Sequence, residues 1–391
     1  MLLTKVLARR SISGGAAGLG AIAIALGVTA LGTSGASAAQ APAVPSGPAP
    51  IKVNANNWSG SAKFGSSSPA WYTDVSGLVH LRGAARQTHS QGPGANFLGT
   101  LPRKARPSRN VYVIVHTFAG TYADLEVARN GHINLIDPRQ PAVKDYTFVS
   151  LEGITYKRSQ PGTSPVTVNG NNWSGNAHYG STAPAWYKDA SGIVHLQGAA
   201  TQTSNSGTGQ NLLGTLPPVA WPVRNVFEIV HTFNGTYADL EVSTTGQINL
   251  IDPYGFAVKD YHFVSLEGVS YSPGAIFNSL APPFPGLNTA NWSGNAGFGS
   301  SEPGWNEDTS GVIHLQGAVT QISLSGDTSL IATLPAVIRP GRTVYTIVHT
   351  FNGTYADLSI DPSGQVRVID PRPPMGKDYS FVSLEGVTYH P

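Results

Sequence analysis

The chain has 391 residues, with 24 Lys and Arg against 22 Asp and Glu, no Cys, and a formal net charge of +2. The lack of cysteine excludes disulfides, thiolate metal sites and cysteine nucleophiles. A nearly balanced charge supplies no basic field to hold nucleic acid or an anionic membrane surface.

The first 38 residues have the pattern of an export signal. Lys5, Arg9 and Arg10 precede an uncharged run rich in Ala, Gly, Leu and Ile, and Ala36-Ser37-Ala38 supplies the small residues of a cleavage site. Glycines interrupt the run, which is short for a membrane span, so we expect cleavage after Ala38 and membrane contact only if the segment stays uncleaved. Cleavage leaves 21 of the 24 basic residues against 22 acidic ones. We therefore predict a secreted, extracellular protein.

Residues 39–50 form a Pro/Ala-rich linker, which we expect to be extended and mobile. After it, one series of motifs is written three times, beginning at Asn57-Trp58-Ser59-Gly60, Asn172-Trp173-Ser174-Gly175 and Asn291-Trp292-Ser293-Gly294. A unit this long is a whole domain rather than a solenoid repeat. The predicted modules are residues 51–157, 166–272 and 286–391. Triplication favours binding, because weak sites gain avidity when they are linked.

Within each module the apolar residues alternate with polar ones, and turn signals recur every 8 to 12 residues. Asn130-Gly131 predicts a β-hairpin, and Ser363-Gly364 occupies the same place in the third module. No window shows helical spacing of apolar residues. We therefore predict an all-β fold of three tandem antiparallel β-sandwich modules, with about eight strands in each.

Two histidines and two carboxylates recur in each module and are candidates for chemistry. His80 and His116, with Asp124 nearby, are able in principle to form a zinc or general-base site, although the spacing matches no metal motif. Strand histidines bonded to a backbone carbonyl are the favoured interpretation. Asp124 and Glu152 are the one pair suited to glycosidase acid–base chemistry. A turn, or an edge salt bridge with Lys144, explains Glu152 equally well. The counterparts are His195, His231, Asp239 and Glu267, and His314, His349, Asp357 and Glu385.

From these residues we predict no enzyme activity, no metal and no cofactor. The other two copies show no basic cluster to match Arg103, Lys104, Arg106 and Arg109 of the first module, and we interpret this cluster as a solvated loop.

Aromatic residues are the better candidates for a binding site. A ring beside a carboxylate suits a sugar, whose C–H face stacks on the ring while its hydroxyls bind the polar group. Packing in the core or at its rim is the open alternative. Trp58, Trp173 and Trp292 are assigned to the core. The predicted ligand-binding residues are Trp71, Tyr122 and Asp124, then Trp186, Tyr237 and Asp239, then Trp305, Tyr355 and Asp357.

The order of motifs resembles the β-sandwich head domains of phage tail fibres and receptor-binding tail proteins. The resemblance rests on the strand Gly77–Gly83, the Leu-Gly-Thr-Leu-Pro segment ending at Pro102 with Pro107 after it, the hairpin at Gly131 and the closing strand from Val149. It implies a jelly-roll-like sandwich and binding to cell-surface glycans. Because such heads are usually homotrimers, it also implies that the three modules pack as an intramolecular pseudo-trimer. The chain departs from these heads in its export signal and in lacking a fibre stalk.

The sequence thus favours a secreted, multivalent, non-enzymatic protein that binds cell-surface or extracellular carbohydrate. A structural or adhesive envelope protein that binds other proteins is the alternative, and a glycoside hydrolase using the Asp and Glu of each module is the less favoured one. The expected partner is a glycan or cell-surface polymer and not nucleic acid. We expect a monomer with internal pseudo-threefold symmetry or a small homo-oligomer.

Overall fold

The structure is a computed structural model that describes residues 46–61, 63–118, 121–136, 146–159, 162–233, 236–251, 261–274, 286–295, 297–351, 354–369 and 379–391. These residues belong to one compact unit. The predicted signal segment and residues 39–45 of the linker lie outside the described residues. No helix in the described ranges has the length and apolar character needed to cross a membrane.

The first module contains twelve strands in two antiparallel sheets. They are β1 (Ser46–Pro50), β2 (Lys52–Val53), β3 (Trp58–Gly60), β4 (Ala70–Thr73), β5 (Leu78–Arg82), β6 (Ala84–Gln87), β7 (Phe97–Thr100), β8 (Val111–Thr117), β9 (Thr121–Val127), β10 (His132–Ile136), β11 (Val149–Ser150) and β12 (Thr155–Lys157). The sheet orders are β2-β7-β10-β9-β8-β11-β6-β3 and β1-β4-β5-β12.

The second module repeats both sheets strand for strand. It contains β13 (Ser164–Pro165), β14 (Thr167–Val168), β15 (Trp173–Gly175), β16 (Ala185–Lys188), β17 (Val194–Gln197), β18 (Ala199–Gln202), β19 (Leu212–Thr215), β20 (Val226–Thr232), β21 (Thr236–Val242), β22 (Gln247–Ile251), β23 (Val264–Ser265) and β24 (Ser270–Tyr271).

The third module has the same order without counterparts of β1 and β2 among its described strands. It contains β25 (Trp292–Gly294), β26 (Gly304–Glu307), β27 (Ile313–Gln316), β28 (Ala318–Gln321), β29 (Leu330–Thr333), β30 (Val344–Thr350), β31 (Thr354–Ile360), β32 (Gln365–Ile369), β33 (Val382–Ser383) and β34 (Thr388–Tyr389). Six short 3₁₀ turns complete the described elements: η1 (Lys63–Gly65), η2 (Arg103–Ala105), η3 (His178–Gly180), η4 (Pro218–Ala220), η5 (Gly297–Gly299) and η6 (Ala336–Ile338).

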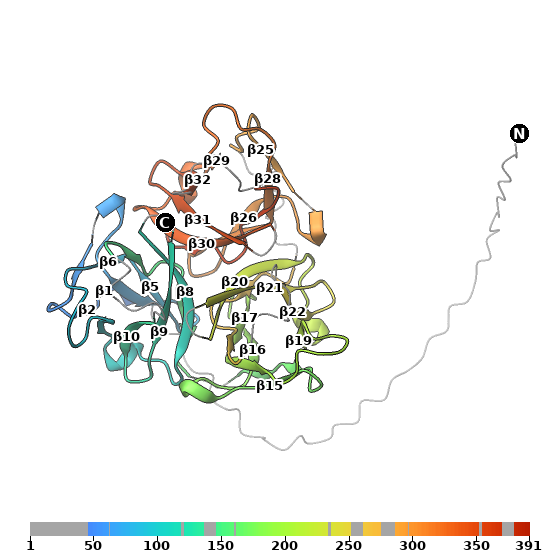
Figure 1. Cartoon of the computed structure of the whole chain (residues 1–391). Helices are drawn as coiled ribbons and strands as arrows, with labels where there is room; N and C mark the ends of the chain where they lie inside the picture. The colour runs from blue at the N-terminus through green and yellow to red at the C-terminus, as the bar shows by residue number, and fades with distance from the viewer. Residues whose placement is uncertain are drawn as a thin grey trace, which may run out of the picture. The chain divides into compact units, whose positions relative to one another are not determined.

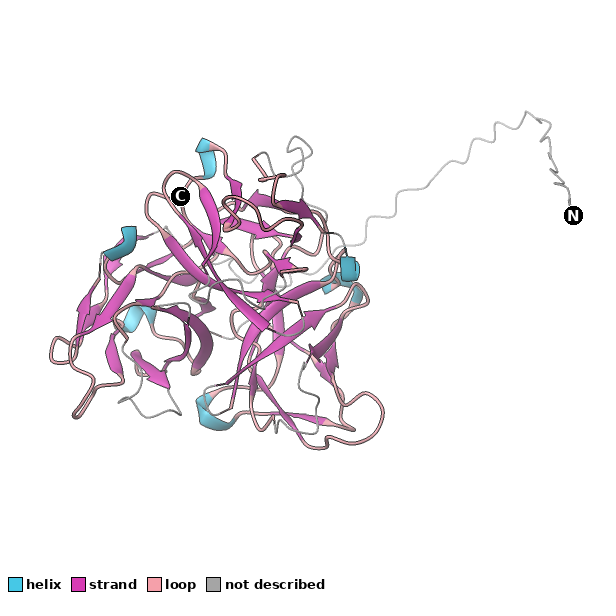
Figure 2. Cartoon of the chain, turned by 45° about the horizontal axis from the view of Figure 1, so that its top comes forward, coloured by secondary structure: helices cyan, strands magenta, loops and turns pink. Residues whose placement is uncertain are grey.

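The all-β prediction is confirmed, and strands dominate the view in Figure 2. Two details differ from the expectation. Each module has more strands than the eight predicted, because several have only two or three residues and leave no periodic signal. Residues 46–50, placed in the linker, form β1 and pair with β4, with Ala49 opposite Trp71. The module therefore begins before Ile51.

The core of each module lies between its two sheets. Trp58, Trp173 and Trp292 are buried at its centre, as predicted, each at most 1% exposed. The indole N–H of Trp58 donates to the carbonyl of Ala95 at 2.9 Å, so the ring is buried without leaving its polar atom unpaired. The hairpin at Asn130-Gly131 is also confirmed, because β9 and β10 pair on either side of it and Gly131 has φ 88°.

The three modules surround their longest central strands. The strands β8, β20 and β30 each contact the other two, as Figure 1 shows at the centre of the view. The first module contacts the second, the second contacts the third, and the third returns to the first through equivalent residues. The chain thus forms a closed ring with pseudo-threefold symmetry, in agreement with the predicted pseudo-trimer.

Candidate functional site

The boundaries between modules are closed by buried Arg–Glu pairs. Nε of Arg109 lies 2.6 Å from Oε1 of Glu267, and its Nη2 lies 2.7 Å from Oε2. The same carboxylate accepts the backbone N–H of Gly198 at 2.8 Å. The other two boundaries carry equivalent pairs, Arg224 with Glu385 and Arg342 with Glu152.

These pairs correct two sequence interpretations. Arg109 is not in a solvated loop: it is 1% exposed, and it has counterparts in the other modules at positions where the basic cluster was thought to be missing. Glu152 pairs with Arg342 of the third module, whereas Lys144 lies outside the described residues.

Each boundary also carries a buried His–Asp pair. Nδ1 of His231 bonds Oδ1 of Asp124, and the ring of His231 stacks on Tyr112 with centroids 5.4 Å apart. The other boundaries repeat the contact, with His116 on Asp357 and His349 on Asp239. We expected backbone carbonyls as partners, but the histidines bond carboxylates of the neighbouring module. Asp124, which we placed near His116, therefore bonds His231 of the second module, and His116 bonds Asp357 of the third module.

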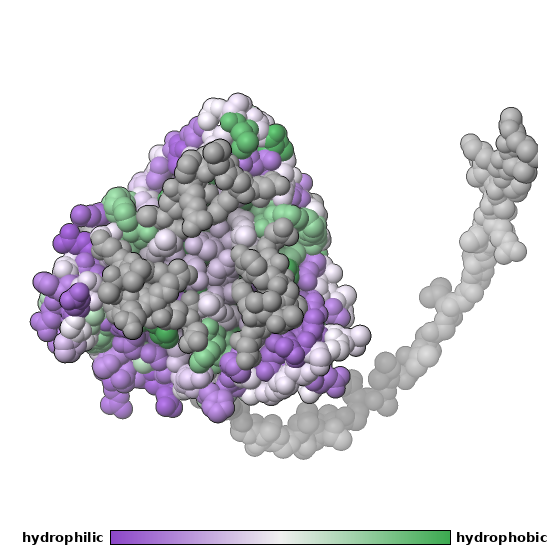
Figure 3. Space-filling view, viewed as in Figure 1, coloured by the Kyte–Doolittle hydropathy of each residue, from purple (hydrophilic) through white to green (hydrophobic). Residues whose placement is uncertain are grey.

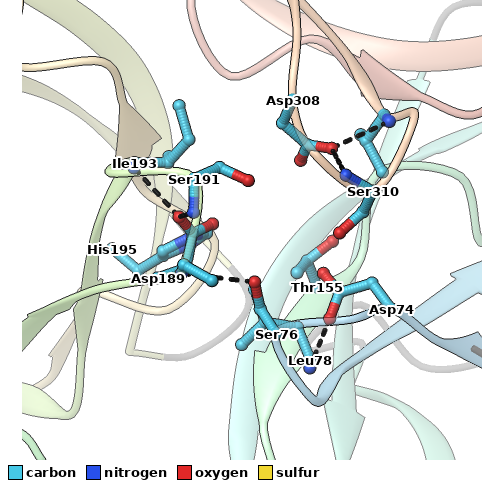
Figure 4. A network of polar contacts seen from close by, with 12 residues as sticks. Asp74, Ser76, Leu78, Thr155, Asp189, Ser191, Ile193, His195, Asp308 and Ser310 are labelled. Carbon is cyan, nitrogen blue, oxygen red and sulfur yellow. Dashed lines mark hydrogen bonds and ion pairs between the residues drawn. The ribbon is translucent and has the colours of Figure 1, made fainter. Parts of the chain in front are cut away.

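The other recurring histidine of each module belongs to a separate network, of which Figure 4 shows His195 and Asp189 in the second module. Nε2 of His80 lies 3.0 Å from Oδ2 of Asp74, and Oγ1 of Thr155 lies 3.0 Å from its Nδ1. His195 with Asp189 and His314 with Asp308 repeat the first contact. Residues of all three modules line the small cavity between these networks. Its volume of about 20 Å³ holds a water molecule but no sugar.

The candidate acids and bases are therefore held in structural contacts. Asp124 and Glu152 are 1% and 6% exposed, and each bonds a cationic or histidine side chain of another module. In the part of the chain that the structure describes, no group of three or more His, Cys, Asp or Glu side chains is placed to bind a metal ion.

The predicted ligand-binding tyrosines meet one another. Tyr122, Tyr237 and Tyr355 form a ring of three edge-to-face contacts, each with centroids 5.2 Å apart. Edge-to-face contact is a favourable arrangement of aromatic rings. The tyrosines therefore contribute to packing where the three modules meet.

The predicted tryptophans lie on strands rather than in turns. Trp71 on β4 and Trp186 on β16 are 2% and 9% exposed, and both belong to hydrophobic cores. Trp305 on β26 is half-buried against the third core. Lys104 covers the Trp71 ring with its ammonium 5.0 Å from the centroid. Trp71 and Trp186 do not present the open stacking faces that we expected, because β4 and β16 turn their rings into the cores, whereas Trp305 keeps part of its surface exposed.

Other aromatic rings are exposed, and they recur in all three modules. We call each group an aromatic platform: an exposed leading ring, a second ring beside it that is exposed in Phe118 and half-buried in Phe233 and Phe351, and a third ring buried beneath them. In platform 1 the rings of Phe64 and Phe118 stack 5.5 Å apart, and they are 50% and 45% exposed. Phe148 meets Phe64 edge-on at 5.6 Å. The other groups are Tyr179, Phe233 and Phe263 (platform 2) and Phe298, Phe351 and Phe381 (platform 3).

The leading ring of each platform is held by an unusual backbone. Phe64, Tyr179 and Phe298 have φ values of 56°, 55° and 54°, the left-handed region, and no other described residue except glycine has positive φ. Such a conformation costs a bulky residue roughly 1–2 kcal/mol. The next residue is a glycine with positive φ, and a Cβ on Gly180 would approach Asn110 to 2.8 Å.

The neighbouring module fixes this turn. The amide of Asn110 and the hydroxyl of Tyr112 donate to the carbonyl of Tyr179 at 2.8 and 2.7 Å. A glycine in place of Tyr179 would offer the same backbone carbonyl without strain. The hydrogen bonds to this carbonyl therefore do not explain why the residue is aromatic. An aromatic side chain stands at each of the three positions, and each packs against a buried Phe.

The sequence held a signal for the platforms that we did not use. An aromatic residue followed by Gly-Ser occurs in each copy, as Phe64-Gly65, Tyr179-Gly180 and Phe298-Gly299.

Apolar residues form separate patches among polar ones on the face in Figure 3.

A search of protein-family models, curated proteins and solved structures found no match to this chain. What defines the protein is therefore its own structure: three β-sandwich modules closed into a ring, with one aromatic platform on each.

Proposed function

We propose that the protein is secreted and binds cell-surface or extracellular carbohydrate through its three aromatic platforms. The observation that carries this proposal is the half-exposed ring of Phe64, Tyr179 and Phe298, kept in a strained turn in every module. The binding role and the multivalency predicted from sequence remain, but the platforms take the place of Trp71, Tyr122, Asp124 and their counterparts.

The chemistry of the platforms supports a sugar ligand. The exposed leading rings offer an apolar face for the C–H groups of a pyranose, and polar groups beside such a ring serve its hydroxyls. At platform 2 the ring of His178 lies beside that of Tyr179, with centroids 6.4 Å apart. The rings are rigid, because a buried Phe supports them and the next module bonds their backbone. Preorganised rings lose little conformational entropy on binding.

The number of platforms supports a polymeric ligand. One exposed stacking site is expected to bind weakly, near millimolar. Three sites on one ring gain roughly 100-fold or more on a surface that they can engage together. The resemblance to receptor-binding head domains and the predicted export signal are consistent with this role.

The test is a set of three substitutions in the full mature chain, Phe64→Gly, Tyr179→Gly and Phe298→Gly. Glycine suits the positive φ, so the fold is expected to persist while the stacking faces are lost. The matched control is Val337→Ala, which truncates an 80% exposed apolar side chain away from the platforms. We expect binding to glycan arrays and polysaccharide beads to fall at least 100-fold in the triple variant and to stay unchanged in the control.

The two alternative functions, adhesion to envelope proteins and glycoside hydrolysis, predict different results for the wild-type chain. If the wild-type chain binds envelope proteins stripped of glycan and binds no glycan, the adhesive alternative replaces the proposal. If it releases reducing sugar from a polysaccharide, and Asp124→Asn or Glu152→Gln abolishes that release in a folded variant, it is a hydrolase.

A further inference from the structure

The three platforms share their rings but differ in charge. The residue before the leading ring is Lys63 in platform 1, His178 in platform 2 and Gly297 in platform 3. A second position, on β6, β18 and β28, holds Arg86, Thr201 and Thr320. Platform 1 thus has two cationic residues where platform 3 has none.

The second and third modules show that this strand position borders the platform. Oγ1 of Thr201 donates to the carbonyl of His262 at 2.7 Å, and the His262 ring meets Phe233 edge-on at 5.9 Å. In the third module Thr320 donates to the carbonyl of Ser380 at 2.9 Å, next to Phe381 of platform 3. Arg86 occupies the same register in the first module, opposite Ser59.

The neighbouring module adds to the charge difference between the platforms, because it places a carboxylate beside platforms 2 and 3 but a neutral residue at the same position beside platform 1. Beside platform 2, Glu126 bonds Asn110, whose amide holds the carbonyl of Tyr179. Beside platform 3, Glu241 bonds Asn225 in the same way. Beside platform 1 the corresponding residues are the neutral Thr343 and Ser359, and the carbonyl of Phe64 accepts from Tyr345.

The cations of platform 1 are available for a ligand. Lys63 is exposed and Arg86 is half-buried, and neither forms an ion pair with a carboxylate in the described ranges. Platform 1 therefore combines a stacking face with two unpaired positive charges, whereas platform 3 has a stacking face beside one carboxylate.

We propose that platform 1 binds an anionic sugar residue, one that carries a carboxylate or a phosphate, while platform 3 binds neutral sugar. This inference rests on the proposed carbohydrate-binding function. A guanidinium suits either anion, since both accept paired hydrogen bonds. The ring thereby recognises a polymer, or a mixture of polymers, in which charged and neutral sugars occur together.

The experiment isolates platform 1 in the full mature chain by Tyr179→Gly and Phe298→Gly. Binding is measured by affinity electrophoresis and calorimetry with polygalacturonate, dextran phosphate and unmodified dextran. The first two probes separate carboxylate from phosphate, and the third is neutral. We expect tighter binding to at least one anionic probe than to dextran, and a loss of that preference in high salt.

The charge variant on this background is Lys63→Gln with Arg86→Thr, the latter using the residue of the other modules. Each exposed charge contributes a factor of about five or less, so we expect binding to the preferred anionic probe to fall roughly tenfold and dextran binding to stay unchanged. Lys52→Gln with Arg103→Thr removes two exposed charges elsewhere and is the matched control.

The two proposals fail in different ways. If Phe64→Gly on this background abolishes binding to all probes but the charge variant changes none, the charge inference is overturned and the carbohydrate function stands. If the control pair lowers anionic binding as much as the charge variant does, the inference is overturned in favour of general electrostatic attraction. If the chain with three intact platforms binds no probe and no glycan on an array, the proposed function itself fails.

Discussion

The guanidinium of Arg109 and the carboxylate of Glu267 form a bidentate ion pair across the boundary of the first and second modules, with N–O distances of 2.6 and 2.7 Å. The two residues are 1% and 4% exposed. Burial alone would lower the pKa of Arg109, but the charge of Glu267 raises it above its usual value. The ion pair therefore keeps the Arg109 guanidinium charged inside the boundary, and equivalent pairs at the other two boundaries close the ring.

Removing one member of such a pair leaves an unpaired buried charge. We expect Arg109→Met to lower the free energy of unfolding by about 3–5 kcal/mol, as measured by urea denaturation. Arg109→Met combined with Glu267→Gln is the matched control, because the amide oxygen still accepts the N–H of Gly198. We expect the double variant to recover most of the loss. A single variant as stable as the wild type would contradict the boundary described here.

A buried carboxyl makes stability depend on pH. Glu228 on β20 lines a cavity of about 60 Å³ where the modules meet, and it stands where the other modules have Val113 and Thr346. Burial, with a smaller contribution from the charge of Glu385, raises the pKa of Glu228 well above its usual 4.5. Because the folded state holds this proton more tightly than the unfolded state, its stabilising effect is present at low pH and is lost as the pH rises above about 4.5.

We therefore expect Glu228→Thr to raise the melting temperature at pH 8 by about 2 °C or more, with a difference that shrinks towards pH 4. The third module has Thr346 at this position, so the substitution introduces a side chain that the same fold already contains there. Scanning calorimetry from pH 4 to pH 8 measures the effect. A difference that is constant with pH would show that Glu228 does not titrate on unfolding.

A single module is predicted to trimerise. Residues 46–159 contain Arg109, Glu152, His116 and Asp124, so three identical copies supply every pair that closes the natural ring. We expect a trimer of all-β subunits in analytical ultracentrifugation. Residues 164–274 would bring three copies of Glu228 to the central cavity, and we expect that trimer to dissociate more readily as the pH rises. A stable monomer from residues 46–159 would contradict this account of the boundaries.

The strained turn predicts an unusual response to mutation. Phe298→Gly removes a ring that is 59% exposed and relieves a left-handed backbone. We expect its melting temperature to lie within about 2 °C of the wild-type value or above it. Trp292→Ala in the core is the contrast, with an expected loss of about 3–5 kcal/mol. Destabilisation of Phe298→Gly by more than about 2 kcal/mol would assign the ring a packing role.

Local patterns in the sequence predicted the repeated β modules well. The alternation in β8 and β9, the Asn-Gly turn between β9 and β10, and the burial of Trp58 follow from interactions within about 40 residues. Trp71 was not placed correctly, because its environment depends on strand β1, which has the composition of a linker. Arg109 and Glu267 lie 158 residues apart in the chain, and no local sequence pattern predicts that they form an ion pair.

The candidate site was missed for a physical reason as well. A half-exposed aromatic residue and a buried one look the same in sequence, and positive φ is not anticipated at Phe64 because aromatic residues rarely adopt it. The residues that we weighed for chemistry, such as Asp124 and His116, are retained in each copy because the ring uses them three times. Recurrence of a residue in all three copies therefore does not distinguish a residue of a module boundary from a residue of a platform.

The most direct test of the central claim, that the three platforms bind carbohydrate together, is a graded series on one polysaccharide surface. Chains with three, two, one and no intact platforms, made by Phe64→Gly, Tyr179→Gly and Phe298→Gly, are compared by surface plasmon resonance. We predict that the dissociation rate rises stepwise with each platform removed, by roughly tenfold or more per step, and that the chain without platforms does not bind. Equal dissociation rates across the series would contradict the account.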